Sequence, residues 1–99
     1  MVTGVGAQVE RISRMATVEI YSKSWCPFCR MAKRLLEEKG QEFVEFDVEL
    51  DAGKYDEMLE RSQGRWTVPE IFIDGELIGG FDELRALEAS GELDEMLDS

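Results

Sequence analysis

The apolar positions of this chain follow two periods, one of two residues and one of three to four. Alternation, or a short apolar run, predicts strands at residues 17–21, 42–46, 71–73 and 77–78. Helical spacing predicts helices at residues 31–39, 55–64 and 84–97, the last interrupted at Gly91. Asp74-Gly75 is a two-residue hairpin signal between the last two strands. The predicted order of elements is therefore β-α-β-α-β-β-α.

The length and composition fit a single domain. A chain of 99 residues with 43% hydrophobic residues can form one compact core. We expect residues 15–99 to form this domain, since they carry the regular pattern. Residues 1–14 lack the apolar block and cleavage pattern of a secretory signal, and we expect them to be a flexible N-terminal extension. The apolar runs are too short to span a membrane, so we expect no membrane association.

The charge is strongly acidic but unevenly distributed. A net charge of −11, from 22 acidic and 11 basic residues, argues against a nucleic-acid partner, which requires a basic surface. Five basic residues nevertheless gather near the two cysteines: Lys23, Arg30, Lys33, Arg34 and Lys39. They are either an ordinary solvated helix face or a locally positive site suited to a thiolate and an anionic thiol substrate. The absence of histidine removes the usual general base and the commonest metal ligand.

The two cysteines of the chain lie between the first predicted strand and the first predicted helix, in Trp25-Cys26-Pro27-Phe28-Cys29. A Cys-x-x-Cys at this place in a β-α-β pattern is typical of a thioredoxin-like redox site. Cys26 is expected at the helix start, where unpaired backbone N–H groups and the helix dipole favour a thiolate. Pro27 suits the first helical position, and Cys29, one turn deeper, is better placed to resolve a mixed disulfide. Trp25 and Phe28 offer flat apolar contacts.

Two other interpretations of the cysteine pair are weaker. Two inert buried cysteines would have this spacing only by coincidence. A zinc site needs about four ligands, whereas the chain offers two thiolates and no imidazole, so we predict no metal site. Without a secretory signal, a closely spaced pair indicates a reducing compartment, the cytoplasm, in which the thiols react rather than cross-link.

Four motifs in order make the chain resemble the glutaredoxins, and among them the small bacterial dithiol type. The resemblance covers residues 15–97. The motifs are Tyr21-Ser22-Lys23, Cys26-Pro27-Phe28-Cys29, Thr67-Val68-Pro69, and Gly79-Gly80-Phe81-Asp82 followed by Leu84. The resemblance implies a thioredoxin-like α/β fold with a four-stranded mixed sheet flanked by helices. It also implies a monomeric glutathione-dependent oxidoreductase that has no tightly bound cofactor and acts on disulfide-containing or glutathionylated proteins.

The resemblance also implies roles for residues around the thiols. Cys26 would be the nucleophile and Cys29 the resolving thiol. Lys23 would face the glycine carboxylate of glutathione. Phe28 stands where many relatives have tyrosine, so that a ring contact would remain without a phenolic hydrogen bond.

Two further motifs would complete the glutathione site. Thr67-Val68-Pro69 would contain a cis proline, with the Val68 backbone pairing with the cysteine of glutathione; the residues alone would favour a trans proline opening an edge strand. Gly80 would allow close approach of the ligand. Backbone N–H groups at Gly80 and Phe81 would bind the γ-glutamyl carboxylate, and Asp82 the amino group.

One departure from the family pattern and two rival functions remain to be considered. Many relatives have arginine directly before Thr67, where this chain has Trp66; Arg65 lies one residue further back, which does not favour a carboxylate contact from it. One rival is a glutaredoxin-like electron donor reduced by thioredoxin reductase, which the Gly-Gly-Phe-Asp segment disfavours. The other is an iron–sulfur cluster carrier with Cys26 and glutathione as ligands across a dimer, which Pro27 disfavours.

Overall fold

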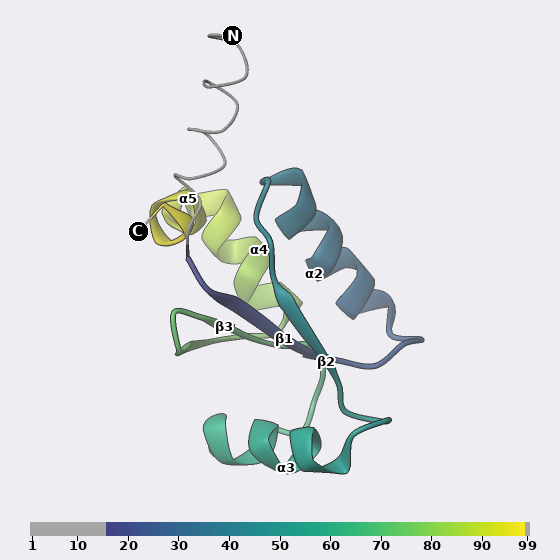
Figure 1. The fold of residues 1–99 in the computed structure, drawn as a ribbon. Helices are drawn as coiled ribbons and strands as arrows, with labels where there is room; N and C mark the ends of the chain where they lie inside the picture. The colour runs from purple at the N-terminus through teal and green to yellow at the C-terminus, as the bar shows by residue number, and fades with distance from the viewer. Residues whose placement is uncertain (1–15, 99) are drawn as a thin grey trace, which may run out of the picture.

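The computed structural model describes residues 16–98 as a four-stranded mixed sheet with helices on both faces (Figure 1). The strand order is β2-β1-β3-β4. Strand β1 (Val18–Ser22) pairs in parallel with β2 (Val44–Asp47) and antiparallel with β3 (Glu70–Ile73). Strand β4 (Glu76–Gly79) completes an antiparallel hairpin with β3. The expected α/β architecture and element order are confirmed.

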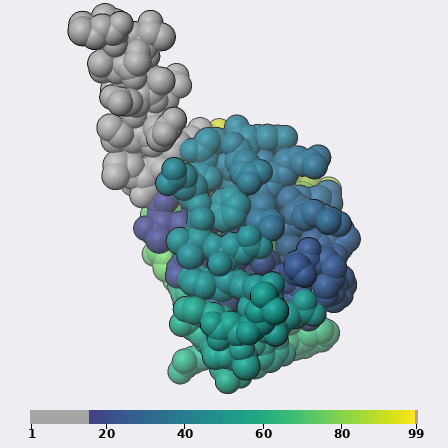
Figure 2. All heavy atoms as spheres, turned by 45° about the vertical axis from the view of Figure 1, so that its right-hand side comes forward, coloured from purple at the N-terminus to yellow at the C-terminus, as the bar shows by residue number. Residues whose placement is uncertain are grey.

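The helices divide between the two faces of the sheet (Figure 1). Helix α2 (Pro27–Glu38), α4 (Phe81–Ser90) and α5 (Glu92–Leu97) lie on one face, and α3 (Ala52–Arg61) lies on the other. Gly91 separates α4 from α5 in a left-handed conformation, φ +85°, which confirms the predicted interruption. The space-filling view shows the blue α2 segment and the teal segment that follows it meeting on one continuous surface (Figure 2).

The core has one part on each face of the sheet. The larger part packs β1 and β3 against α2, α4 and α5, and its buried residues are Ala16, Val18, Ile20, Ala32, Leu36, Ile71, Ile73, Leu84, Leu93 and Leu97. The smaller part lies under α3 and comprises Tyr21, Val48, Met58 and Phe72. This two-sided burial explains why β1 and β3 are almost wholly buried, and it fixes their ends beside the start of α2.

The boundaries of several elements differ from the sequence prediction. Helix α2 begins four residues earlier than the apolar spacing indicated, at Pro27, as the proline signal itself favoured. Strand β2 begins two residues later and ends one residue later than the predicted 42–46. The hairpin turn is confirmed, because Asp74 and Gly75 both have positive φ, +52° and +82°, as a type I′ turn requires.

Two expectations concern the ends of the chain and membranes. The predicted N-terminal extension, residues 1–14, lies outside the described residues, and the domain boundary at residue 15 stays a prediction. Within residues 16–98, no helix has the length and apolar character needed to cross a membrane.

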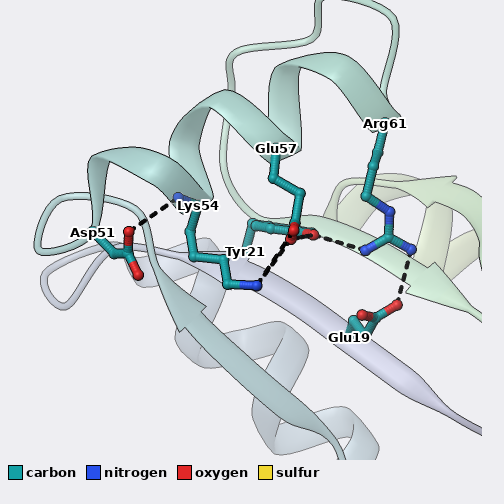
Figure 3. A network of polar contacts seen from close by, with 6 residues as sticks. All are labelled: Glu19, Tyr21, Asp51, Lys54, Glu57 and Arg61. Carbon is teal, nitrogen blue, oxygen red and sulfur yellow. Dashed lines mark hydrogen bonds and ion pairs between the residues drawn. The ribbon is translucent and has the colours of Figure 1, made fainter.

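A polar network joins α3 to the sheet (Figure 3). The Tyr21 hydroxyl donates to Glu57 Oε1 at 2.5 Å and accepts from Arg61 Nη1 at 2.7 Å. Arg61 Nη2 also donates to Glu19 Oε1 at 2.9 Å, and Lys54 Nζ lies 3.1 Å from Glu57 Oε1. Burial, with the hydrogen bond to Glu57, raises the pKa of Tyr21 to about 12. The network therefore holds α3 against β1 through a neutral phenol placed between opposite charges.

Candidate active site

Cys26 is the residue that caps the N-terminus of α2. Its backbone is extended, and its Sγ accepts a hydrogen bond from the backbone N–H of Cys29 at 3.2 Å. The Lys23 carbonyl oxygen accepts from the Cys26 N–H at 3.3 Å, and Pro27 occupies the first helical position. The sulfur, in a residue only 7% exposed, therefore lies at the positive end of the helix dipole. This places the Cys26 sulfur at the start of α2, where the sequence predicted it.

Cys29 lies in a different environment one turn along the helix. It is fully buried, and both cysteines are free thiols. Burial, followed by the hydrogen bond with Cys26, raises the pKa of the Cys29 thiol well above its ordinary value. Because a thiolate is the attacking species in disulfide exchange, Cys29 is a poor first nucleophile. The two cysteines therefore lie in different environments, one at the cap of α2 and the other fully buried inside the helix.

The segment before β3 lies against the Cys26 sulfur. Cys26 Sγ is 3.8 Å from the Val68 carbonyl oxygen, a distance at which a thiol donates a weak hydrogen bond. The Val68–Pro69 peptide bond is cis. The resemblance therefore predicted this bond correctly, and the trans proline favoured by the residues alone was wrong.

A groove of about 210 Å³ runs from this segment to the start of α4. Its lining residues are Phe28, Arg65, Thr67, Val68, Pro69, Gly80, Phe81, Asp82 and Glu83. Seven of the eight residues expected to bind glutathione are thus brought together, although they come from three separate parts of the chain. Lys23 is the exception, since its Nζ lies 5.9 Å from the Trp25 ring centroid and its side chain does not line the groove.

The N-terminus of α4 forms one wall of the groove. The Gly80 N–H donates to Glu83 Oε1 at 2.7 Å, so this donor is already satisfied within the protein. The N–H groups of Phe81 and Asp82 belong to the first helical turn, whose donors have no intrahelical acceptor. They are the groups best placed to bind an anion. Gly79 allows this arrangement, because its φ is +119° and a Cβ there would lie 2.8 Å from Glu83 Oε1.

Aromatic rings form another part of the site. The Phe28 and Phe81 rings stack across the groove, with centroids 6.3 Å apart and planes inclined by 27°. Phe28 remains 56% exposed, so its other face is available to a ligand. Trp25 lies outside the lining and donates from Nε1 to Glu49 Oε2 at 3.1 Å. The flat apolar contact expected of both residues is therefore offered in the groove by Phe28.

Arg65 is the residue that the sequence argument undervalued. It lines the groove, with Nε 3.3 Å from Glu70 Oε2 and Nη2 3.9 Å from Glu83 Oε1. The Ser62 hydroxyl fixes its backbone, since it accepts from the Arg65 N–H and donates to the Arg65 carbonyl, both at 3.0 Å. The signal that could have found Arg65 is its distance of two residues from the motif that Thr67 begins, which ties both to one loop.

Two of the five basic residues near the cysteines pair with carboxylates of other elements. Lys33 Nζ pairs with Glu45 Oε2 at 2.9 Å, and Lys39 bridges Glu88 and Asp94 at 2.6 and 2.9 Å. These two lysines fit the interpretation of an ordinary helix face better than that of a positive reaction site. Within residues 16–98, no three cysteine or carboxylate side chains are grouped so that they could hold a metal ion.

A sequence model of one family, Glutaredoxin, matches residues 18–78, which include the thiols, the cis proline and most of the sheet. The chain belongs to the glutaredoxin family. Over 83 residues it is 54% identical to Glutaredoxin 3 of Escherichia coli K12, covering 84% of this chain and 99% of that protein. The expected class of thiol–disulfide oxidoreductase is thereby confirmed for this glutaredoxin.

Solved structures agree with the fold of this glutaredoxin. The solution structure of glutaredoxin from Brucella melitensis is 46% identical, with a TM-score of 0.73, covering 86% of this chain and 91% of that one. A buckwheat glutaredoxin–glutathione complex has a TM-score of 0.75 and covers 96% of this chain and 88% of that one. At 22% identity, the buckwheat structure supports the shared thioredoxin-like fold alone.

Proposed function

We propose that this glutaredoxin uses glutathione to reduce protein disulfides and glutathione mixed disulfides through Cys26 and Cys29. The observation that carries the proposal is the position of Cys26 Sγ, at a helix N-terminus and 3.8 Å from the Val68 carbonyl oxygen beside the groove. A disulfide substrate lying in the groove would present its sulfur to this thiol. The fully buried Cys29 stands one helical turn behind it as the second thiol.

The reaction follows from the unequal thiols. The Cys26 thiolate attacks one sulfur of the substrate disulfide, the S–S bond breaks, and the other sulfur leaves as a thiolate that takes up a proton. Cys29 then loses its proton and attacks the Cys26 mixed disulfide, which releases the second substrate thiol and leaves a Cys26–Cys29 disulfide. Two glutathione molecules supply the two electrons that restore the dithiol. With a glutathione mixed disulfide, a second glutathione can replace Cys29 in the resolving step.

The groove supports a specific orientation for glutathione. The N–H groups of Phe81 and Asp82 would bind the γ-glutamyl carboxylate, and the Asp82 carboxylate would bind the amino group. The Val68 backbone would pair with the cysteine of glutathione beside Cys26. Arg65 reaches the groove directly and would bind the glycine carboxylate, with Lys23 as a more distant charge.

Single cysteine replacements test the proposal. Cys26→Ser should abolish turnover in a glutathione-coupled assay with every disulfide substrate. Cys29→Ser should retain reduction of glutathione mixed disulfides and lose reduction of protein disulfides. An active Cys26→Ser protein, or a Cys29→Ser protein that loses both activities while remaining folded, would contradict the assignment.

The proposal extends to the setting of the enzyme. We expect a monomer in the cytoplasm, where glutathione keeps thiols reduced, without nucleic-acid or membrane partners. The net charge of −11 supports the exclusion of nucleic acid. Visible absorption after anaerobic purification tests the iron–sulfur alternative, because a bound cluster would give a band that a dithiol enzyme lacks.

A further inference from the structure

A carboxylate is buried directly behind the groove. Glu70 opens β3 immediately after Pro69 and is fully buried. Neither of its carboxylate oxygens makes an aligned hydrogen bond with the described residues. Burying a carboxylate is costly unless an opposite charge compensates it. The other residues of β3, Ile71, Phe72 and Ile73, are apolar. A buried acid at the start of this strand therefore requires a compensating partner.

The compensating charge is Arg65. Its Nε lies 3.3 Å from Glu70 Oε2, while Nη2, at the other end of the guanidinium, lies 3.9 Å from Glu83 Oε1 on the α4 side. A guanidinium is a rigid plane, so a partner that holds the Nε edge also sets the direction of the two terminal nitrogens. Glu70 holds this edge from beneath, and the side chain of Arg65, 40% exposed, lines the groove above.

We propose that Glu70 is a positioning residue of the groove, which holds Arg65 by its Nε so that the guanidinium is oriented to bind the glycine carboxylate of glutathione. This inference rests on the proposed function. Glu70 itself does not line the groove, so it acts through Arg65 and not by touching the substrate. The role differs from that of Asp82, which faces the ligand directly.

The groups that face Glu70 predict a pH dependence. Burial raises the pKa of Glu70, Arg65 opposes that rise, and the charge of Glu83 on α4 adds to it. The Thr67 hydroxyl also opposes the rise, and Tyr21, the register partner of Glu70 on the neighbouring strand β1, is a neutral phenol. Glu70 is therefore ionised, and holds Arg65, above its raised pKa. The ion pair between Glu70 and Arg65 is lost as the pH falls through the raised pKa of Glu70. This occurs at a higher pH than it would for an ordinary glutamate.

Binding of S-methylglutathione, which cannot form a disulfide, tests the inference by titration calorimetry on the full chain. Glu70→Gln keeps the shape of the side chain and removes its charge. We expect it to raise the Kd about tenfold near neutral pH, equivalent to about 1.4 kcal/mol. As the pH is lowered from neutral, the wild-type Kd should rise where Glu70 takes up its proton, whereas the Kd of Glu70→Gln should not show this rise. Glu76→Gln, the same change at an exposed residue of the hairpin's far end, should match wild type.

Two further arms separate positioning from a structural effect. S-methylglutathione with its glycine carboxylate converted to an amide should bind wild type and Glu70→Gln equally. In an Arg65→Gln background, Glu70→Gln should add no further loss, because its target is already absent. Urea unfolding of each variant establishes that it is folded at the temperature of the titration.

Each contrary result has a distinct meaning. Equal Kd values and equal pH profiles for wild type and Glu70→Gln would overturn the inference about Glu70. If the wild-type protein still turned over glutathione, the proposed function would stand. An undiminished effect of Glu70→Gln in the Arg65→Gln background, or with the amide probe, would overturn the inference in the same way. A wild-type protein that neither binds S-methylglutathione nor turns over glutathione would overturn the proposed function, and the inference with it.

Discussion

Replacing Tyr21 by phenylalanine tests the attachment of α3 to the sheet. The residue is fully buried, with its ring 5.1 Å from Phe46 and 5.7 Å from Phe72 between centroids. Only the hydroxyl would be lost, and with it the hydrogen bonds to Glu57 and from Arg61. The apolar packing would stay, because phenylalanine fills the same space. The change therefore isolates the polar part of the contact.

The size of the effect follows from the partners. A hydrogen bond to a charged group contributes about 1.5–3 kcal/mol to stability. The side chains of Glu57 and Arg61 are 39% and 27% exposed. Water can therefore replace much of the hydrogen bond that each loses with the Tyr21 hydroxyl. We therefore expect Tyr21→Phe to lower the free energy of unfolding by about 2 kcal/mol, below the sum of two full bonds. For a domain of this size, that corresponds to a fall in Tm of roughly 10 °C.

The pH dependence gives an independent measurement of the same hydroxyl. The native pKa of Tyr21, about 12, is raised above the ordinary tyrosine value of about 10. Its contribution to stability is complete below about pH 10 and is lost as pH rises toward about 12. Each pKa unit corresponds to about 1.4 kcal/mol, so the loss over this range should approach about 3 kcal/mol. Tyr21→Phe should lack this part of the alkaline destabilisation.

Urea denaturation followed by far-ultraviolet circular dichroism, at neutral pH and at about pH 11, measures both effects. Tyr55→Phe is the matched control, since it makes the same change at the other tyrosine of the chain. The reasoning is refuted if Tyr21→Phe loses less than about 0.5 kcal/mol at neutral pH, the scale of an ordinary surface substitution. It is also refuted if both tyrosine variants lose stability equally between neutral and alkaline pH.

Three further replacements test the site and the helix contacts. Lys23→Glu should raise the KM for glutathione, more at low salt because screening is weaker there, and an unchanged KM would make Lys23 an ordinary surface lysine. Asp82→Lys should lower glutathione-dependent turnover about tenfold, or about 1.4 kcal/mol, while the rate with a small neutral disulfide stays near wild type; equal losses with both substrates would indicate damage to the fold or thiol. Lys39→Met, which removes the bridge to Glu88 and Asp94, should lower the unfolding free energy by about 1 kcal/mol and less in high salt, and a salt-independent loss would contradict an ionic cause.

The features that the sequence predicted well are set by local chemistry. The hairpin depends on Asp74 and Gly75, whose positive φ angles are a property of the turn itself. The position of Cys26 at the cap of α2 follows from Pro27, which begins the helix. Strand β2 was placed less well because it is an edge strand paired only with β1, and its Val44 is 51% exposed.

The charged part of the groove could not be predicted, because it depends on contacts between distant segments. Glu70 follows a proline and begins a strand, and nothing in that local pattern indicates full burial or an arginine 3.3 Å away. Glu83 is an acid in the first turn of α4, and its carboxylate accepts from the Gly80 N–H and lies 3.9 Å from Arg65 Nη2, contacts that no local pattern indicates. The ion pair of Lys33 could not be predicted for the same reason, because its partner Glu45 lies on a different element, β2.

An acidic protein can still bind an anionic substrate, because the relevant positive charge in this glutaredoxin is local. Two helix N-termini meet at the groove: α2 begins beside Cys26, and α4 begins at Phe81. The N–H groups of these first turns attract an anion at short range. The repulsion from the net charge of −11 comes from exposed residues and is screened by salt. It follows that neutralising exposed acids far from the groove should change the rate of glutathione encounter more than the strength of binding. Changes at the groove, to Asp82 or through Arg65, should instead appear in the dissociation rate, since they act on contacts made only after the ligand is bound.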